Sequence, residues 1–436
     1  MIRKMKELVD DEKVEPVILP EEGFEGDYII ATYFYRSTPQ KDVYEKAKSF
    51  AIGQTIGTWV PVPGITKEMR KKYGGKVVAI YDIPPVELTT DLPETTAHII
   101  QIAFPDENFS PQFPMLLTTL LGNDVSTSAQ VKLLDIKFSK KFLNAFQGPR
   151  FGIDGLYKYF GIKEKRPIIL NMIKPCLGYS PEEGAKIFRD IALGGVDIVK
   201  DDELFADTNY SSIVDRVKKY TKVAKEVQSQ TGHLTKYCVN ITDRMDKMIE
   251  HAYRVIEAGA GLLMINFIAA GISSLQALAE DKSINIPILV HYASAGSMTE
   301  SPFTGISTPL LLGKLSRLAG ADMCLFSSPY STYPFLNIRY KQIADIQRLP
   351  LGNLLPVMPV IGGGVHPNSA ERIVQDLGRE VVLASGGAIL GHPYGPIEGA
   401  KSMMQAAEAL GKGIKLIDLA NKKGFEALKI SLEKWK

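Results

Sequence analysis

The strongest constraint on the fold is a repeated alternation of short apolar runs with longer amphipathic stretches, which begins near residue 167. Their starts lie 25 to 39 residues apart, so each interval has room for one helix and two loops. Because the runs are almost continuously apolar, we expect parallel strands buried on both faces. Eight such units predict a closed (β/α)8 TIM barrel, with a doubly wound open sheet as the alternative. The runs are residues 167–174, 196–200, 235–240, 261–266, 286–291, 321–326, 355–361 and 381–384.

The first 150 residues lack this alternation and predict a separate α+β domain of the ferredoxin-like kind, with helices on one face of an antiparallel sheet. We therefore divide the chain into residues 1–150 and a barrel over 151–436 that ends in a helical tail. Within the barrel, Ser180 and Glu183 form the pattern of a capping box at a helix start. In the first domain we expect strands at 28–37, 75–85 and 97–105 and a helix at 41–54.

The composition excludes several classes of protein. Lys and Arg number 51 against 49 Asp and Glu, and a net charge of +2 gives no electrostatic case for nucleic acid or a membrane surface. Three cysteines are too few for a disulfide framework, and two of them lie in apolar runs typical of buried thiols. The N-terminal residues lack a signal-peptide core, and no apolar stretch reaches about 20 residues. We expect a soluble cytoplasmic enzyme.

Polar residues gather where the expected strands end, which is where barrel enzymes carry their catalytic groups. The strand ends include Lys174, Lys200 and His291. Glycines follow the seventh and eighth strands, at 362–364 and 386–387, and this is the usual phosphate position of the fold. Backbone N–H groups of such turns bind anions, although the same glycines would also serve as simple turns.

The segment after the second strand reads Lys200-Asp201-Asp202-Glu203. Carboxylate oxygens suit Mg²⁺, so Asp202 and Glu203 are candidate ligands, with a solvated acidic turn as the alternative. Lys200 should point into the barrel mouth, where its amine can add CO₂ and become a third anionic ligand.

These residues carry a family resemblance. Residues 194–203, Gly-Gly-Val-Asp-Ile-Val-Lys-Asp-Asp-Glu, resemble the metal-site signature of the ribulose bisphosphate carboxylase (RuBisCO) large-chain superfamily. Other matching motifs extend from about Thr32 to Pro396, a combination that is highly specific. They are Gly57-Thr58-Trp59, Leu121-Gly122-Asn123, Phe146-Gln147-Gly148-Pro149-Arg150, Lys174-Pro175 and Gly391-His392-Pro393.

The resemblance implies a metal site and a base. Lys200 would be the carbamylated lysine (N-carboxylysine), with CO₂ bound as the carbamate. Asp202 and Glu203 would be ligands of one Mg²⁺ per subunit. Lys174 would be the general base, because a desolvated lysine beside a divalent cation can have a lowered pKa.

The resemblance also implies a substrate site and an assembly. Asn123 would hydrogen-bond the substrate, and His291 would contact the enolate or the phosphate end, with a core histidine as the alternative. The N-terminal domain would complete the site of a neighbouring subunit in an obligate homodimer or a larger assembly of dimers, with no small subunit. The implied phosphate-binding residues are Thr58, Trp59, Gly363, Gly364, Gly386 and Gly387.

The sequence departs from true carboxylases at several positions. The loop at 326–334 has no lysine to steady CO₂, and Cys176 replaces the second lysine of the first strand motif. Tyr292 replaces an arginine that holds a second phosphate, while Gly53 and Gly362 replace an acidic residue and a serine. The losses fall on the second phosphate and on CO₂ handling, so the chain resembles a RuBisCO-like protein (form IV type) rather than a carboxylase.

We expect a Mg²⁺-dependent lyase or isomerase that forms an enolate from a mono-phosphorylated ketose or sugar acid. Enolases of 2,3-diketo-5-methylthiopentyl 1-phosphate, from methionine salvage, resemble the chain but place a lysine at the position of Asn123. The first expectation is therefore a decarboxylase of the 3-oxo-isoapionate 4-phosphate type. That enolase and a ketose-phosphate isomerase are alternatives, and a non-catalytic protein that binds a phosphorylated metabolite is another.

Overall fold

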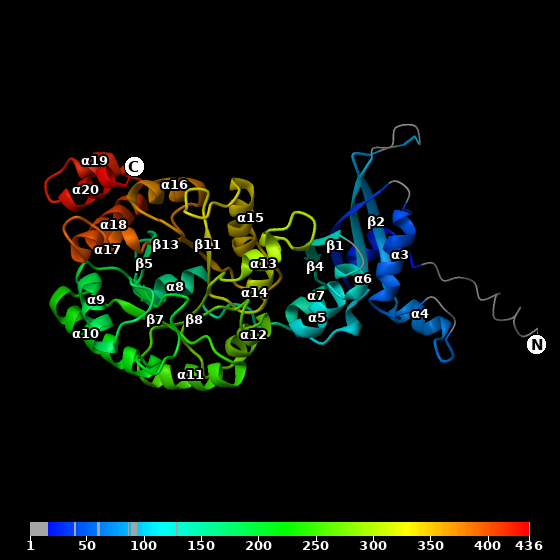
Figure 1. The fold of residues 1–436 in the computed structure, drawn as a ribbon, viewed down its shortest axis with the longest axis horizontal. Coiled ribbons are helices and arrows are strands. Elements are labelled where there is room, and N and C mark those ends of the chain that lie inside the picture. Colours follow the sequence, from blue (N-terminus) through cyan, green and yellow to red (C-terminus); the bar gives the residue numbers. More distant parts are fainter. Residues whose placement is uncertain are drawn as a thin grey trace, which may run out of the picture. The chain divides into compact units, whose positions relative to one another are not determined.

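The chain divides into two compact units in a computed structural model that describes residues 16–38, 41–58, 62–85, 87–88, 94–127 and 130–435 (Figure 1). Unit 1 is Met1–Ala145 with Ser297–Leu310, and unit 2 is Phe146–Gly296 with Leu311–Lys436.

Unit 2 is built on a closed barrel of eight parallel strands in the order β11-β12-β13-β5-β6-β7-β8-β9. Each expected apolar run overlaps one of these strands, with β11 and β12 each extending one residue beyond its run, so the predicted (β/α)8 barrel is confirmed and the open sheet is excluded. The strands are β5 (Ile168–Met172), β6 (Ile198–Lys200), β7 (Lys236–Asn240), β8 (Leu262–Ile265), β9 (Ile288–Val290), β11 (Met323–Ser327), β12 (Met358–Gly362) and β13 (Val382–Ala384).

Helices follow the strands around the barrel, and the tail is helical as expected. The predicted capping box is present, since Glu183 N donates to Ser180 Oγ at 3.2 Å and Ser180 N donates to Glu183 Oε2 at 2.8 Å. The helices of unit 2 are α8 (Gly152–Phe160), α9 (Pro181–Leu193), α10 (Ile213–Thr231), α11 (Met245–Glu257), α12 (Ile272–Glu280), the π-helix Pro309–Leu315 at its edge, α14 (Ser316–Leu318), α15 (Asn337–Arg348), α16 (Pro367–Leu377), α17 (Gly387–Leu390), α18 (Pro396–Gly411), α19 (Leu416–Ala420) and α20 (Glu426–Lys434), while α13 (Ala295–Thr299) runs from unit 2 into unit 1.

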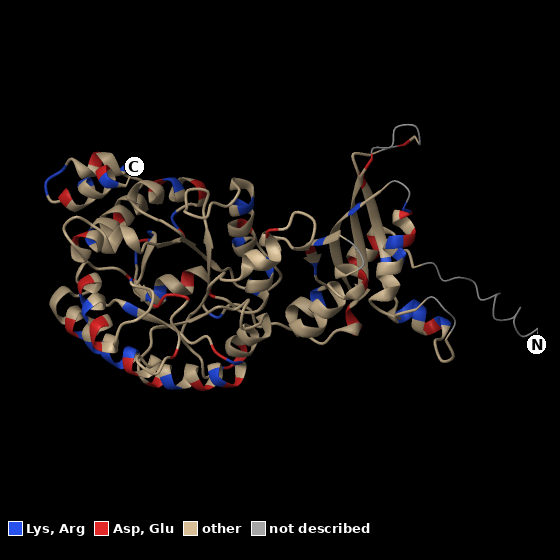
Figure 2. Ribbon diagram, in the orientation of Figure 1, with Lys and Arg blue, Asp and Glu red and all other residues tan. Residues whose placement is uncertain are grey.

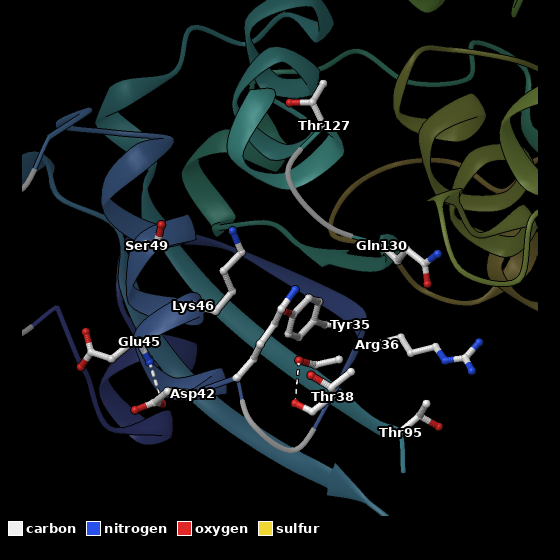
Figure 3. A pocket seen from close by; sticks show the side chains of 12 residues that line it. Tyr35, Arg36, Thr38, Asp42, Glu45, Lys46, Ser49, Thr95, Thr127 and Gln130 are labelled. Carbon is white, nitrogen blue, oxygen red and sulfur yellow. Dashed lines mark hydrogen bonds between the residues drawn. The ribbon is translucent and has the colours of Figure 1, made fainter.

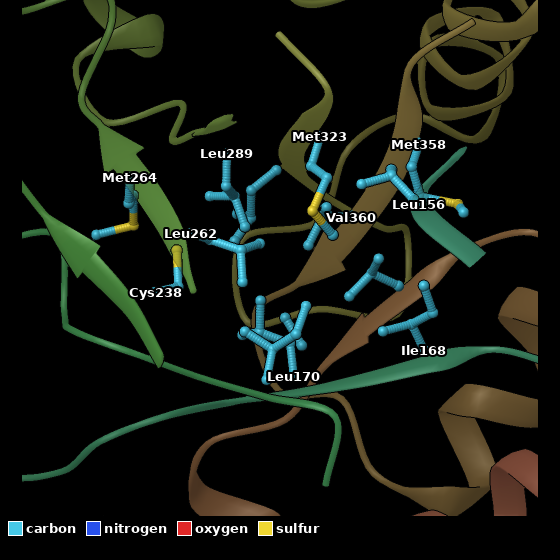
Figure 4. Close-up of a cluster of buried hydrophobic side chains, with 14 of the residues drawn as sticks. Leu156, Ile168, Leu170, Cys238, Leu262, Met264, Leu289, Met323, Met358 and Val360 are labelled. Carbon is cyan, nitrogen blue, oxygen red and sulfur yellow. The ribbon is translucent and has the colours of Figure 1, made fainter. Parts of the chain in front are cut away.

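The barrel interior is a cluster of buried hydrophobic side chains (Figure 4). Ile168 and Leu170 of β5 both belong to it, which is the alternation expected when every second strand residue faces inward. Leu156 and Tyr157 of α8 join the same cluster. This core leaves the polar strand ends as the place for chemistry.

Asp322, just before β11, ties together the starts of several segments. Its carboxylate accepts hydrogen bonds from the backbone N–H groups of Arg150 (2.9 Å), Phe151 (2.8 Å) and Ile288 (2.9 Å). Burial raises the pKa of Asp322 to about 6, although the three N–H donors oppose that shift.

Unit 1 contains a five-stranded sheet in the order β10-β4-β1-β3-β2. Helices follow both β1 and β3 along the chain. Together with the strand order β4-β1-β3-β2, this is the expected ferredoxin-like pattern. Its elements are α2 (Pro20–Glu25), β1 (Tyr28–Ser37), α3 (Val43–Gly53), α4 (Lys67–Tyr73), β2 (Lys76–Ile83), β3 (Thr96–Pro105), the 3₁₀-helix Asp106–Asn108, α5 (Phe113–Leu120), α6 (Asn123–Ser126), β4 (Gln130–Lys137), α7 (Lys140–Asn144) and β10 (Gly305–Ile306).

Strand β10 comes from the chain between β9 and β11 and pairs in parallel with β4. Lys132 of β4 fixes this segment, since its Nζ donates to the carbonyls of Thr299 (2.6 Å) and Ser301 (2.5 Å). A two-residue strand has no sequence signature, which is why the pattern of residues 297–310 does not predict it.

Basic and acidic residues are interspersed along the outer helices α10 and α11 of the barrel (Figure 2). Among the described residues, no helix combines the length and the apolar character needed to cross a membrane.

Candidate active site

The two aspartates after β6 face different surroundings. Asp201 is buried and accepts hydrogen bonds from Tyr237 Oη (2.5 Å), Arg216 Nη2 (3.2 Å) and Asn240 N (3.0 Å). Burial alone would lower the pKa of Arg216, but Asp201 and Tyr237 raise it overall, so the pair is ionic. The Asp201 carboxylate is thus fully used by hydrogen bonds within the protein. Asp202 and Glu203 remain as the carboxylates that could bind a ligand.

Asp202 is paired with the expected base. Lys174 Nζ lies 2.6 Å from Asp202 Oδ2 and 3.0 Å from Cys176 Sγ. Burial alone would lower the pKa of Lys174, yet these two contacts raise it above its ordinary value. For the carboxylate the signs are reversed: burial alone would raise the pKa of Asp202, but Lys174 and Lys200 lower it overall. The lowered lysine pKa expected beside a divalent cation stays a prediction, because it depends on a cation bound at Asp202.

Lys200 and His291 flank the other carboxylate. The Lys200 side chain is fully buried, and its Nζ donates to Asp201 O at 2.8 Å and lies 3.7 Å from Glu203 Oε2. His291 Nε2 lies 3.4 Å from the same Glu203 oxygen. Burial, reinforced by Lys200, holds the pKa of His291 well below its usual value. Because His291 Nδ1 accepts from Ala293 N (3.1 Å), the neutral ring carries its proton on Nε2, toward Glu203.

Two asparagines hold the backbone of the same segment. Asn240 Nδ2 donates to the carbonyls of Asp202 (3.3 Å) and Glu203 (3.2 Å). Asn266 Nδ2 donates to Glu203 O at 2.8 Å, while its buried Oδ1 has no hydrogen-bond partner in the described structure. The ends of β7 and β8 thereby fix the turn that presents the two carboxylates.

The glycines expected to bind phosphate differ in geometry. Gly363 and Gly364 have φ angles of 85° and 88°, which side-chain-bearing residues rarely adopt. A side chain on Gly386 would meet Met172 Cγ at 2.9 Å, whereas one on Gly387 would enter open space. All four follow β12 and β13, at the same end of the barrel as Lys200 and His291.

The remaining expected site residues belong to unit 1. Asn123 begins α6 and is exposed, and Thr58 O accepts from Arg70 Nη1 at 3.2 Å. Trp59 lies outside the described residues. Their predicted meeting with the barrel residues stays a prediction.

Unit 1 has a hollow of its own, with a volume of about 1130 Å³ (Figure 3). Tyr35 and Arg36 of β1 and Lys46 and Ser49 of α3 line it. Basic and acidic side chains both face it, and none of the expected site residues is among its lining. The hollow therefore adds nothing to the expected chemistry.

The side chains at this end of the barrel can be compared with the ligands that a divalent metal requires. Within the described chain, no three or more His, Cys, Asp and Glu side chains are arranged to hold a metal ion. Asp202 and Glu203 supply two carboxylates, and a carbamate on Lys200 Nζ would supply the third beside Glu203. An oxygen-only set of this kind fits Mg²⁺.

Sequence models of known protein families match most of the chain. Residues 22–142 match the ribulose bisphosphate carboxylase large chain N-terminal domain, and residues 152–328 and 343–435 match its catalytic domain. The chain belongs to the RuBisCO large-chain family. Among its RuBisCO relatives, a carboxylase-like protein of Archaeoglobus fulgidus is 40% identical over 402 residues, or 92% of each chain. A 2,3-diketo-5-methylthiopentyl-1-phosphate enolase of Bacillus cytotoxicus is 38% identical over 390 residues, covering 89% of this chain and 94% of that one.

Solved RuBisCO-family structures show the same fold. A rubisco-like protein from Alicyclobacillus acidocaldarius superposes with a TM-score of 0.86 at 34% identity, over 94% of this chain and 100% of that one. A dimeric archaeal RuBisCO from Hyperthermus butylicus gives 0.84 at 29% identity, over 94% and 96%.

Sequence reasoning missed part of this RuBisCO-family site. Asn240 and Asn266 stand at strand ends, but their bonds to the Asp202–Glu203 backbone are not readable from spacing. In unit 1, a side chain on Gly53 would meet Asp124 Oδ2 at 2.1 Å. The Asp124 carboxylate thus fills the space beside the glycine that replaces the family's acidic residue.

Proposed function

We propose that this RuBisCO-like protein is a Mg²⁺-dependent enolase of a mono-phosphorylated ketone, with 2,3-diketo-5-methylthiopentyl 1-phosphate as the first candidate substrate. The observation that carries the proposal is the cluster of Lys174, Lys200, Asp202 and Glu203 at one end of the barrel. Relatives with that enolase name cover about nine-tenths of the chain, so they favour enolisation over the decarboxylation that the sequence had suggested.

Different residues of the chain would bind the metal, abstract the proton and stabilise the oxyanion. When bound by Asp202, Glu203 and carbamylated Lys200, Mg²⁺ would polarise the substrate carbonyl and stabilise negative charge on its oxygen. Lys174 Nζ would take the proton from the adjacent carbon, which requires that the ammonium first leave Asp202 Oδ2 and give up a proton to solvent. His291, neutral and protonated on Nε2, would donate a hydrogen bond to the developing oxyanion.

The residue at the second phosphate position supports a substrate with a single phosphate. Tyr292 stands where carboxylases resembling this chain have an arginine, and its Oη lies 2.8 Å from Ser327 Oγ. Its ring packs edge-on against Phe335, with centroids 6.1 Å apart. A neutral aromatic wall does not attract a second phosphate, and this argues against ribulose bisphosphate as substrate.

The test is NMR of the full-length protein with the diketo phosphate in D₂O, Mg²⁺ and bicarbonate. We expect deuterium at the carbon next to the carbonyl and accumulation of the enol, both lost in Lys200→Ala. A protein that releases CO₂ from 3-oxo-isoapionate 4-phosphate but leaves the diketo phosphate unchanged would overturn the enolase proposal in favour of the decarboxylase. Absence of turnover with either compound and with ketose phosphates would favour a binding protein.

We further propose a homodimer, or a larger assembly of dimers, without a small subunit. Light scattering coupled to gel filtration tests this, and a monomer at micromolar concentration would contradict it.

A further inference from the structure

The loop after β11 is held down rather than free. Tyr330 Oη donates to Asp376 Oδ2 of α16 at 2.8 Å, and Phe335 N donates to Ser328 O at 3.3 Å. Between these anchors, Thr332 N donates to Gly363 O at 3.1 Å. The loop therefore rests on the glycine turn that follows β12.

Hydroxyl groups crowd this glycine turn. A Cβ on Gly363 would lie 3.1 Å from Ser331 Cβ and 3.4 Å from Ser327 Oγ. A Cβ on Gly364 would lie 3.3 Å from Thr332 Oγ1. The absence of side chains at both glycines is what allows the loop to bring its hydroxyls this close.

The hydrogen bonds at this place are incomplete. Ser331 Oγ is buried and has no hydrogen-bond partner in the part of the chain that the structure describes. Neither Gly363 N nor Gly364 N donates to another described residue. A buried donor without a partner, such as Ser331 Oγ, is destabilising unless a ligand or water accepts from it, whereas the half-buried Gly363 and the exposed Gly364 leave their N–H groups open to a ligand.

We propose that Ser331 and Thr332 donate hydrogen bonds to the phosphate of the substrate, alongside the N–H groups of Gly363 and Gly364. This inference rests on the proposed function and adds two binding residues to it. Carboxylases resembling this chain carry a lysine in this loop, whereas residues 326–334 have none. With no lysine to steady CO₂, the docked loop instead presents neutral hydroxyl donors beside the glycine turn, where they can hydrogen-bond a phosphate.

The test is isothermal titration calorimetry of the full-length protein with inorganic phosphate. Ser331→Ala and Thr332→Val should each weaken binding about tenfold, because each removes a hydrogen bond to a charged group. Thr332→Ser keeps the hydroxyl and should restore affinity. Tyr333→Phe removes an exposed hydroxyl from the same loop and should bind as wild type. Thermal melting of each variant controls for folding.

Gly387→Val separates this inference from the proposed function, because a side chain there meets open space in the fold but should block a phosphate at the β13 loop. If Gly387→Val abolishes binding while Ser331→Ala and Thr332→Val bind as wild type, the hydroxyl proposal is overturned and the phosphate site stands. If the wild-type protein binds no phosphate at millimolar concentration, the phosphate site itself is overturned.

Discussion

Lys174 Nζ and Asp202 Oδ2 lie 2.6 Å apart, so the expected base and an expected metal ligand form one ion pair. The Asp202 side chain is only 2% exposed, whereas that of Lys174 is 41% exposed. The lysine is thus the partner that can move. Occupation of Asp202 by another cation would release the amine toward the mouth of the barrel, which links ligand binding at Asp202 to the freedom of the base.

Replacement of Lys174 by Met should greatly slow proton abstraction. A general base contributes about 10²- to 10⁴-fold to the rate, and we expect a loss in that range in the deuterium-exchange assay. Lys219→Met is the matched control, because its side chain is also 41% exposed and pairs with a surface glutamate, Glu182. Exchange at the wild-type rate in Lys174→Met would assign the base elsewhere.

Asn266→Ala should weaken metal binding without unfolding the barrel. Asn266 holds Glu203 O at 2.8 Å, and loss of a group that orients a ligand typically costs about 10- to 100-fold in affinity. Titration of Mn²⁺ followed by electron paramagnetic resonance, in bicarbonate buffer, measures the effect directly. Asn421→Ala, which removes a bond from an exposed asparagine to Ile417 O, should leave the affinity unchanged. Equal Mn²⁺ affinity in Asn266→Ala and wild type would refute the positioning role.

Arg216→Met should destabilise the fold strongly. It leaves Asp201 buried without its cation, and breaking such a pair costs about 3–5 kcal/mol. Arg244→Met removes an exposed ion pair with Asp246, and we expect a loss of less than about 1 kcal/mol. Urea denaturation of both variants compares the two losses. Similar losses would mean that the buried network adds little.

Asp322 should make stability depend on pH. Its folded pKa is about 6, above the ordinary value of 3.8, so the folded state binds the proton more tightly than the unfolded state. Stability from this group is therefore complete at acid pH and is lost as the pH rises through about 6, by roughly 3 kcal/mol.

The pH effect is measured as a difference between wild type and Asp322→Asn. The stability advantage of the wild type in urea denaturation should shrink between pH 4 and pH 7, because asparagine does not titrate. A constant difference across this range would show that the three N–H donors offset the burial of the carboxylate.

The fold was largely readable from the sequence because its signals are local. Each barrel strand overlaps an expected apolar run, and the Ser180–Glu183 capping box depends on residues three apart. Strand β10 was not readable, since its two residues are held by β4 from far away in the chain.

The site divides in the same way. Chain order placed Lys174, Lys200, Asp202 and Glu203 at neighbouring strand ends, because parallel strands of a barrel present their C-terminal ends together. Spacing did not distinguish the roles of adjacent Asp201 and Asp202. That difference depends on Arg216 and Tyr237, which reach Asp201 from a helix and from the next strand.

The sequence by itself determined the barrel, the ferredoxin-like first domain and the family, since periodicity and contiguous motifs are properties of neighbouring residues. Only the tertiary structure decided that Asp201 is held by Arg216 and Tyr237, that Asn240 and Asn266 hold the turn at Asp202 and Glu203, and that Ser331 lies against Gly363. These contacts join residues far apart in the chain, and packing sets their distances and burial.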